Sequence, residues 1–441
     1  MTQKRPRLFP LFFPIFVELL FTMLTGAVDT LMLSSEGDQA VGAVGTANTY
    51  ISIFLILFSV ISSGMTAVMT QYIGAKRPSV AQQALRLGLL FNLSAGAVIT
   101  AILCLLAEPI LQIVGIARDL LEPARIYLQT VGLFCICNAL TPIYSSYLRS
   151  FGHTADTLVS TVAANLLNLG LNALFLYVMN WGVFGVALAT GISRLVNLLW
   201  VWAAARRRIQ TVQDNAPLNN RELFRKIIQV GLPAAMETSL YNLAITIVIS
   251  LLNRMDSTGM QATARAYTIQ LTNFSFCVGA ALAHANAIFV GWHIGAGELE
   301  ECARTTCRNA RIAIGISVVT ACLLALAAPR ILPFFTDDPQ MARLVGLLLV
   351  VDIFLEIGRA SNLVFGFALK TSGDAVYPMI VAILFAFLCA AGGTWLFGIH
   401  LELLCLGAFI AMALDECVRA VFLFLRWHSG IWKSKVLVKQ A

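Results

Sequence analysis

Several acidic side chains lie inside long apolar stretches of the sequence, where an ionised group is costly to bury. In the first half these are Glu18 and Asp29, and in the second half they are Glu237, Asp352 and Glu356. A charged side chain at the middle of a bilayer costs at least about 2.5 kcal/mol on insertion scales. Acids in such positions are therefore candidates for binding a proton, an inorganic cation or a cationic organic molecule.

Three asparagines follow one another at helical spacing, at Asn165, Asn168 and Asn172. Intervals of three and four residues place their amides on one face of a helix. Amide oxygens of this kind can complete a Na⁺ site around a carboxylate such as Asp29. The same stripe can also join helices through hydrogen bonds, and the spacing alone does not separate these two interpretations.

Glu237 lies deep in its apolar stretch and has no basic residue within four positions. An unpaired glutamate there is expected to be protonated or cation-bound, which makes it a candidate proton carrier. Asp352 and Glu356 can pair with Arg359, one or two helical turns further on. If a central cavity exposes these two acids, their negative charge would attract cationic substrates. The predicted substrate contacts are Glu18, Tyr241, Asp352 and Glu356.

The elements that carry these residues are membrane-spanning helices. Of 441 residues, 59% are hydrophobic and only 12% are charged, whereas soluble domains have about a quarter of their residues charged. A helix needs about 20 apolar residues to cross a bilayer. We therefore predict an all-α integral membrane protein with twelve transmembrane helices. They lie near residues 8–33, 43–72, 87–107, 124–148, 156–179, 182–203, 227–252, 262–293, 310–328, 342–370, 374–397 and 401–426.

Most lysines and arginines fall on alternate connections between these spans, and four arginines, including Arg194 and Arg359, fall within spans. Basic residues accumulate on the cytoplasmic side, so we expect a multi-pass protein of the inner or plasma membrane with both termini cytoplasmic. This pattern accounts for the net charge of +7 without nucleic-acid binding. The short connections leave no room for a catalytic or nucleotide-binding domain, and we predict neither an enzyme nor a cofactor.

The two halves of the chain repeat one another. The P-x-x-x-E pattern that begins at Pro14 recurs at Pro233, an offset of 219, and the LRSFG of residues 148–152 matches the LKTSG of residues 369–373, an offset of 221. Six spans separate the copies, so both have the same orientation in the membrane. The halves are then related by a pseudo-two-fold axis along the membrane normal, as in some secondary transporters.

This repeat divides the chain into three parts. We predict an N-terminal six-helix bundle over residues 1–203 and a C-terminal six-helix bundle with a short cytoplasmic tail over residues 227–441. Residues 204–226, which contain three consecutive arginines and several polar residues, are the expected cytoplasmic linker.

A series of short motifs in this order resembles the multidrug and toxic compound extrusion (MATE) family of transporters. Among them are VDTLMLS at 28–34, QYIGA at 71–75, LRSFG at 148–152, GVALAT at 185–190 and SGDAVYP at 372–378. The resemblance implies two six-helix bundles around a V-shaped chamber. It also implies export of organic cations in exchange for H⁺ or Na⁺, by a protein that works as a monomer.

The resemblance further implies a cation site in the first half. Many bacterial members use an acid on the first helix, an amide and an acid on the fifth and a threonine on the sixth, and these positions match Asp29, Asn168, Asn172 and Thr190. Asn172 replaces the fifth-helix acid, so this site would hold H⁺ or Na⁺ with one carboxylate. In the second half Glu237 matches the seventh-helix acid.

The tenth-helix acid of the family falls at Arg359 in this chain. That substitution departs from the pattern of the second-half Na⁺ site, because a cation there would meet a guanidinium.

The sequence therefore predicts an antiporter that exports organic cations by alternating access. One alternative is a lipid-linked glycan flippase of the same superfamily, which would favour a cationic cavity, whereas the candidate residues here are mainly acidic. An alternative from another class is a channel or receptor-type membrane protein. The two-half repeat and the intramembrane Glu237 argue against it.

Overall fold

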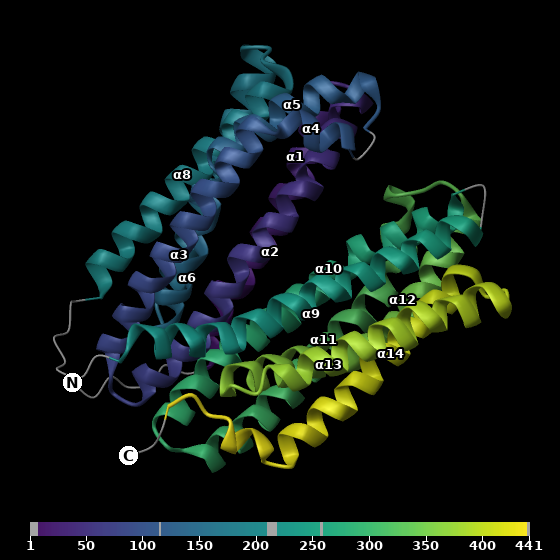
Figure 1. Cartoon of the computed structure of the whole chain (residues 1–441). Coiled ribbons are helices and arrows are strands. Elements are labelled where there is room, and N and C mark those ends of the chain that lie inside the picture. Colours follow the sequence, from purple (N-terminus) through teal and green to yellow (C-terminus); the bar gives the residue numbers. More distant parts are fainter. Residues whose placement is uncertain (1–7, 114–115, 210–217, 256–258, 439–441) are drawn as a thin grey trace. The chain divides into compact units, whose positions relative to one another are not determined.

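The structure is a computed structural model, and all the elements that it describes are helices (Figure 1). It describes residues 8–113, 116–209, 218–255 and 259–438. The chain divides into a first unit, Met1–Gly231, and a second unit, Leu232–Ala441. Part of the predicted linker, residues 210–217, lies outside the described residues, and the rest of it belongs mainly to the helices on either side.

The helices of the first unit correspond to the six spans predicted for the N-terminal half. They are α1 (Leu8–Ser34), α2 (Asp38–Gly74), α3 (Pro78–Leu105), α4 (Ala107–Ile113), α5 (Arg118–Leu133), α6 (Cys135–Ser150), α7 (Thr154–Ala173) with the π-helical turn Leu174–Val178, and α8 (Gly182–Arg208).

The second unit begins inside a long helix, α9 (Asn220–Met255). It continues with α10 (Met260–Gly295), α11 (Leu299–Ile331) with the 3₁₀ turn Leu332–Phe334, α12 (Pro339–Ser372), α13 (Val376–Phe385) with the π-helical segments Ala386–Ala391 and Thr394–His400, α14 (Leu404–His428) and the 3₁₀ turn Ile431–Ser434.

The predicted span 124–148 is broken in the structure. It consists of α5 and α6, which meet at Phe134 with a bend of 46°. The ring of Phe134 lies directly against Gly191 of α8, where a Cβ would collide with it. The bend thus brings an aromatic side chain against a position on α8 that has no side chain of its own.

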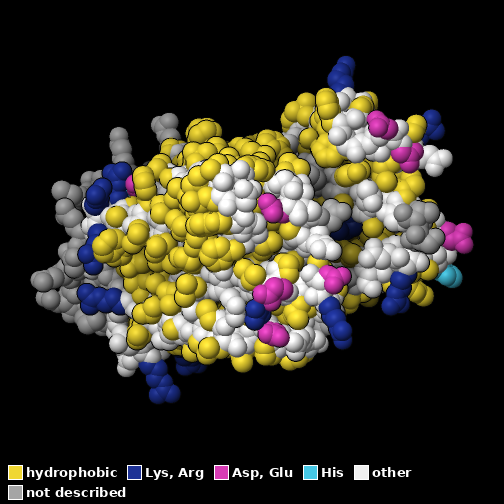
Figure 2. Space-filling model, turned by 90° about the horizontal axis from the view of Figure 1, so that it is seen from above, with side chains coloured by type: hydrophobic (Ala, Val, Ile, Leu, Met, Phe, Trp, Pro, Cys, Tyr) yellow, Lys and Arg dark blue, Asp and Glu magenta, His cyan; other side chains and the backbone are white. Residues whose placement is uncertain are grey.

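Most of the helices are suited to a membrane by length and apolarity. Within the described residues nine helices could cross a bilayer, and a tenth crossing results if α5 and α6 form one span. The two remaining predicted spans, 342–370 and 401–426, are α12 and α14. Both are long helices whose middle turns carry several acidic and basic side chains. Hydrophobic side chains cover broad stretches of the exterior, as expected for contact with lipid (Figure 2).

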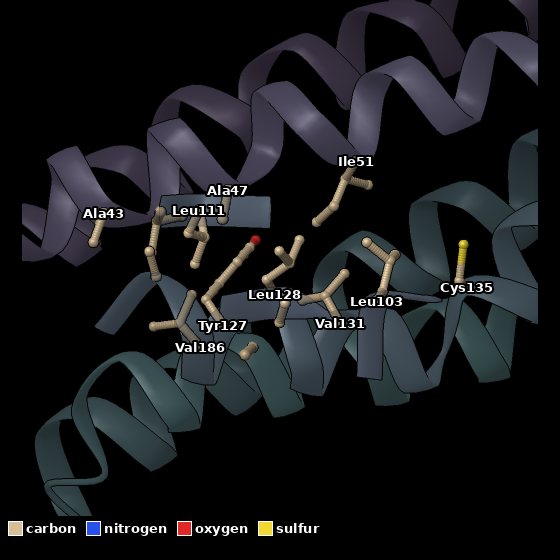
Figure 3. Close-up of a cluster of buried hydrophobic side chains, with 14 of the residues drawn as sticks. Ala43, Ala47, Ile51, Leu103, Leu111, Tyr127, Leu128, Val131, Cys135 and Val186 are labelled. Atoms are coloured by element: carbon tan, nitrogen blue, oxygen red, sulfur yellow. The ribbon is translucent and has the colours of Figure 1, made fainter. Parts of the chain in front are cut away.

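In the first unit α1 packs against α7, α7 against α8, and α8 against α5 and α6. A core of buried apolar side chains joins α2, α3, α5 and α8 (Figure 3). Tyr127 of α5 lies in this core and extends toward the turn of α2 that carries Ala47. This packing brings residues of α1, α5, α7 and α8 that are far apart in the sequence close together.

In the second unit α12 packs against three helices, α10, α11 and α14. α12 approaches α14 closely at Gly358, where a Cβ would lie 2.5 Å from the carbonyl carbon of Glu416. Charged side chains of these two helices are therefore buried beside one another.

Candidate cation and substrate sites

The carboxylate of Asp29, on α1, is held by two amides of α7. Asn172 Nδ2 donates to Asp29 Oδ1 over 2.9 Å. Asn168, with its amide nitrogen turned toward the carboxylate, donates to Oδ1 at 2.9 Å and to Oδ2 at 3.0 Å. Both asparagines are buried, with 5% and 1% of their surface exposed, whereas Asp29 is half-buried. The contact of α1 with α7 therefore brings together three of the residues predicted from the sequence.

Tyr127 connects this group to α2 and α8. Its hydroxyl donates to Asn48 Oδ1 over 3.3 Å, and the hydroxyl of Thr190 is a second neighbour of the phenol. The charge of Asp29 also acts on Tyr127. Thr190 donates its own proton to the carbonyl oxygen of Val186 over 2.9 Å. Tyr127 therefore links Thr190 to the residues around Asp29. We call the following set the Asp29 group: Asp29, Asn48, Tyr127, Asn168, Asn172, Thr190 and Arg194.

Arg194 follows Thr190 by one turn of α8 and adds a positive charge to this group. Its guanidinium acts electrostatically on both Asp29 and Tyr127. It is exposed, and within the described part of the chain it has neither a hydrogen bond nor an ion pair. Asp29 and Arg194 give the Asp29 group one negative and one positive charge.

The sequence alone did not identify Asn48, Tyr127 and Arg194 as members of this group. The sequence did contain a signal for Arg194, because a charged residue in the middle of an apolar span is costly to bury and indicates a partner or a function. Tyr127 and Asn48 had none, since their contact joins residues 79 positions apart.

Two matching ion pairs stand at the repeated P-x-x-x-E motifs. In the first unit Arg149 donates to Glu18 over 2.7 Å, and the hydroxyls of Thr157 and Thr161 donate to the same carboxylate over 3.0 and 3.1 Å. Substrate contact at Glu18 would have to replace these three bonds. In the second unit Lys370 donates to Glu237 over 3.0 Å.

The Lys370 contact corrects the interpretation of Glu237 as an unpaired acid. That interpretation considered only neighbours along the chain, whereas Lys370 approaches from α12, 133 residues away. The other oxygen of Glu237, Oε2, is buried and has no hydrogen bond among the described residues.

The acids of α12 and α14 form a buried network with two arginines, as the spacing of Asp352, Glu356 and Arg359 predicted. Arg359 donates to Glu356 over 2.6 Å and lies 3.9 Å from Asp352. On α14, Arg419 contacts Asp415 and Glu416, each at 2.7 Å.

The sequence predicted substrate contact at Asp352 and Glu356 on the condition that a central cavity exposes them. The structure does not meet this condition. Asp352 and Glu356 are each only 1% exposed, so they do not face an open cavity in this structure. Tyr241, the other substrate candidate of the second unit, directs its hydroxyl to Glu416 Oε1 over 3.4 Å. Arg419 lies over its ring at 5.0 Å.

The class of protein to which this chain belongs is shown by its match to a protein-family model. The family model described as MatE matches residues 14–174 and 233–396, which together form most of the chain. The chain belongs to the MatE family. Its two matched segments correspond to the two copies of the internal repeat.

Individual MatE relatives cover nearly the whole chain. An uncharacterized transporter of Bacillus subtilis, YisQ, is 31% identical over 98% of this chain and 96% of its own length. A probable multidrug resistance protein, NorM of Thermotoga maritima, is 23% identical over 99% of this chain and 95% of its own. An outward-facing multidrug resistance MATE transporter of the MOP superfamily has the same fold. Its TM-score is 0.88 at 20% identity, over 98% of this chain and 96% of that one.

Membership in the MatE family confirms the predicted fold class, an all-helical membrane protein. The protein is a multi-pass membrane transporter and not an enzyme, as the sequence predicted. MatE transporters are ion-coupled antiporters.

Proposed function

We propose that the protein exports amphipathic organic cations in exchange for H⁺, and that Asp29 binds proton and substrate in turn. The observation that carries this proposal is that Asp29 has no ion pair among the described residues. By contrast, three other acids each form an ion pair with a basic side chain. The nitrogen–oxygen distances are 2.7 Å for Glu18, 3.0 Å for Glu237 and 2.6 Å for Glu356.

A carboxylate without a bound base can exchange its ligand. Asp29 is half-buried, so an ion or a substrate can reach it. A proton on Asp29 removes the negative charge that attracts a cationic substrate. Each ligand then favours a different conformation of the transporter, which is the condition for either ligand to shift the equilibrium.

The surroundings of Asp29 support H⁺ over Na⁺ as the coupling ion. Asn168 and Asn172 direct N–H groups toward the carboxylate, and Arg194 adds a positive charge beside it. A sodium ion would need both amides to turn their oxygens toward it, and the positive charge of Arg194 would oppose its binding. A Na⁺ site formed by Asp29, Asn168, Asn172 and Thr190 is the alternative to test.

The names of relatives support a drug-like substrate. The Thermotoga maritima relative is a probable multidrug resistance protein, and the outward-facing structure is that of a multidrug resistance transporter. We further propose that this protein works as a monomer in the inner or plasma membrane, with both termini in the cytoplasm.

The proposal can be tested in proteoliposomes by following ethidium flux under H⁺ and Na⁺ gradients that are imposed separately. We expect the H⁺ gradient alone to drive flux in the wild type, and Asp29→Asn to reduce that flux to background. Glu36→Gln, which alters an exposed acid beyond the end of α1, is the matched control and should transport like the wild type.

Two results would contradict the proposal in different ways. Flux driven only by a Na⁺ gradient would show that Na⁺, and not H⁺, is the coupling ion at Asp29. No flux with either gradient in the wild type would reject organic-cation antiport and favour the glycan flippase.

A further inference from the structure

Arg194 is a charged residue near the midpoint of a membrane-spanning helix, α8 (Gly182–Arg208). Arginine remains protonated in proteins, and a charge at this depth is costly unless a partner or water meets it. The arginines of α12 and α14 have such partners, because Arg359 holds Glu356 and Arg419 holds Asp415. In the described part of the chain Arg194 has no such ion pair.

The position of Arg194 around the helix places it on the inner side of α8. Residues 7 or 11 positions apart lie within about 20° of one another on an α-helix. At these distances from Arg194 lie Ala187, Val201 and Ala205, with 0%, 0% and 5% of their surface exposed, and Val183, which is half-buried. The inner face of α8 that they define packs against α5, α6 and α7.

The lipid-facing side of α8 is a different one. Leu195 and Leu199 are 38% and 52% exposed, and they lie about 100° and 140° around the helix from Arg194. Arg194 is therefore exposed on the same side of α8 as Ala187, Val201 and Ala205, which are buried inside the first unit. Its influence on Asp29 and Tyr127 agrees with this position.

An exposed guanidinium on this inner face is suited to an anionic ligand. Its planar donors match the two oxygens of a carboxylate, and such paired bonds are stronger than neutral ones. Asp29 does not fill this role, because its oxygens accept from Asn168 and Asn172. The Asp29 group thus offers one carboxylate and one guanidinium, a pattern complementary to a molecule that has one charge of each sign.

We propose that Arg194 binds a carboxylate of the transported compound, so that the preferred substrates are amphipathic zwitterions whose cationic group is attracted to Asp29. This inference rests on the proposed export of organic cations and narrows its substrate class. A zwitterion leaves no uncompensated charge in the site, whereas a simple cation would leave the charge of Arg194 unbalanced.

The test is equilibrium binding to the full-length protein in detergent, measured by fluorescence anisotropy with two probes. Rhodamine 110 carries a free carboxyl group, and its methyl ester has the same fluorophore without that group. A charge-assisted bond to the carboxylate predicts that the wild type binds rhodamine 110 about tenfold or more tightly than the ester. In Arg194→Gln we expect the ratio of the two dissociation constants to approach one.

Two further variants distinguish recognition from a structural role. Arg194→Lys keeps the charge but not the paired donors, so its ratio should lie between those of the wild type and Arg194→Gln. Arg118→Gln, at an exposed arginine where α5 begins, should keep the wild-type ratio. If Arg194→Gln does not fold, as judged by thermal unfolding, Arg194→Lys decides the question.

The outcomes separate this inference from the proposed function. Equal binding of the two probes by the wild type, or equal weakening of both in Arg194→Gln, would overturn the role of Arg194 in carboxylate binding. Because the assay needs no ion gradient, a failure of H⁺-driven flux would reject the proposed coupling without affecting this result.

Discussion

The Asp29 carboxylate accepts hydrogen bonds from Asn168 and Asn172, and this determines what a second acid would do there. Two carboxylates that share one site cannot both remain ionised without a bound cation or proton. Asn172→Asp would place a second carboxylate at the position whose amide nitrogen now lies 2.9 Å from Asp29. We expect Na⁺ to raise the thermal unfolding midpoint of this variant by several degrees, roughly 1 kcal/mol or more, and to leave the wild type unchanged.

Asn165→Asp provides the control, because it introduces the same charge on the same helix about two turns away. A Na⁺ response in this variant, or in the wild type, would show that the effect does not depend on a second acid beside Asp29. The measurement is thermal unfolding in detergent with NaCl replaced by choline chloride at equal ionic strength.

The pairs Glu18–Arg149 and Glu237–Lys370 occupy equivalent places in the repeat but differ in the number of hydrogen bonds that the acid accepts. Among the described residues Glu18 accepts three bonds, whereas Glu237 accepts one and its Oε2 has no partner. Removing one partner of a buried pair costs more than the pair itself contributes, because the other charge remains buried. We expect Glu18→Gln to lower the free energy of unfolding by about 2–4 kcal/mol and Glu237→Gln by about 1–2 kcal/mol.

A double-mutant cycle checks this assignment. Lys370→Met combined with Glu237→Gln should recover part of the loss caused by Glu237→Gln alone, since the combination removes the orphaned ammonium. If Glu237→Gln instead abolishes H⁺-driven flux at unchanged stability, Glu237 is a proton carrier, as its sequence neighbours first indicated, and the ion pair is secondary.

Two glycines allow the closest helix approach within the first unit. A Cβ at Gly231, in the first part of α9, would collide with the carbonyl oxygen of Val60 on α2, and one at Gly64 would collide with that of Ile227. Overpacking of this kind typically costs 1–3 kcal/mol, and backbone neighbours cannot move aside. We expect Gly231→Ala to lower the free energy of unfolding by about that amount, measured by thermal unfolding in detergent.

Gly315→Ala is the matched control for this change. Gly315 lies inside α11 with open space where its Cβ would be, so alanine should stabilise the helix by about 0.5–1 kcal/mol. Equal effects of the two substitutions would mean that the close approach of α9 to α2 is not retained in solution.

The helices were largely predictable because apolar runs of sufficient length specify membrane spans without reference to tertiary structure. The bend at Phe134 was not, since it accompanies the packing of that ring against Gly191, 57 residues away. The residues of the candidate site likewise divide into those that the sequence could identify and those that only the fold brings together. The apolar surroundings of Asp29 marked it as a candidate, helical spacing related Asn168 to Asn172, and the resemblance added Thr190. Contacts between distant segments, such as that of Lys370 with Glu237, left no local pattern.

The orientation of the whole chain in the membrane follows from where basic side chains gather. Arg206, Arg207 and Arg208 end α8, and Lys433 follows α14, so the positive-inside rule predicts a cytoplasmic C-terminus. Green fluorescent protein fused to the C-terminus should fluoresce in a bacterial host, whereas alkaline phosphatase fused there should be inactive. The opposite pattern would invert the predicted orientation.

The buried charges of α12 and α14 also affect how the protein is made. During synthesis α12 enters the bilayer before α14, and its Asp352, Glu356 and Arg359 must be accommodated while α14 is still missing. On α14 the Asp415–Arg419 pair is local, but Glu416 accepts from Asn362 of α12 over 2.6 Å. The second half is therefore expected to remain a substrate for quality-control proteases until its last helix is inserted, so that chains truncated before α14 do not accumulate.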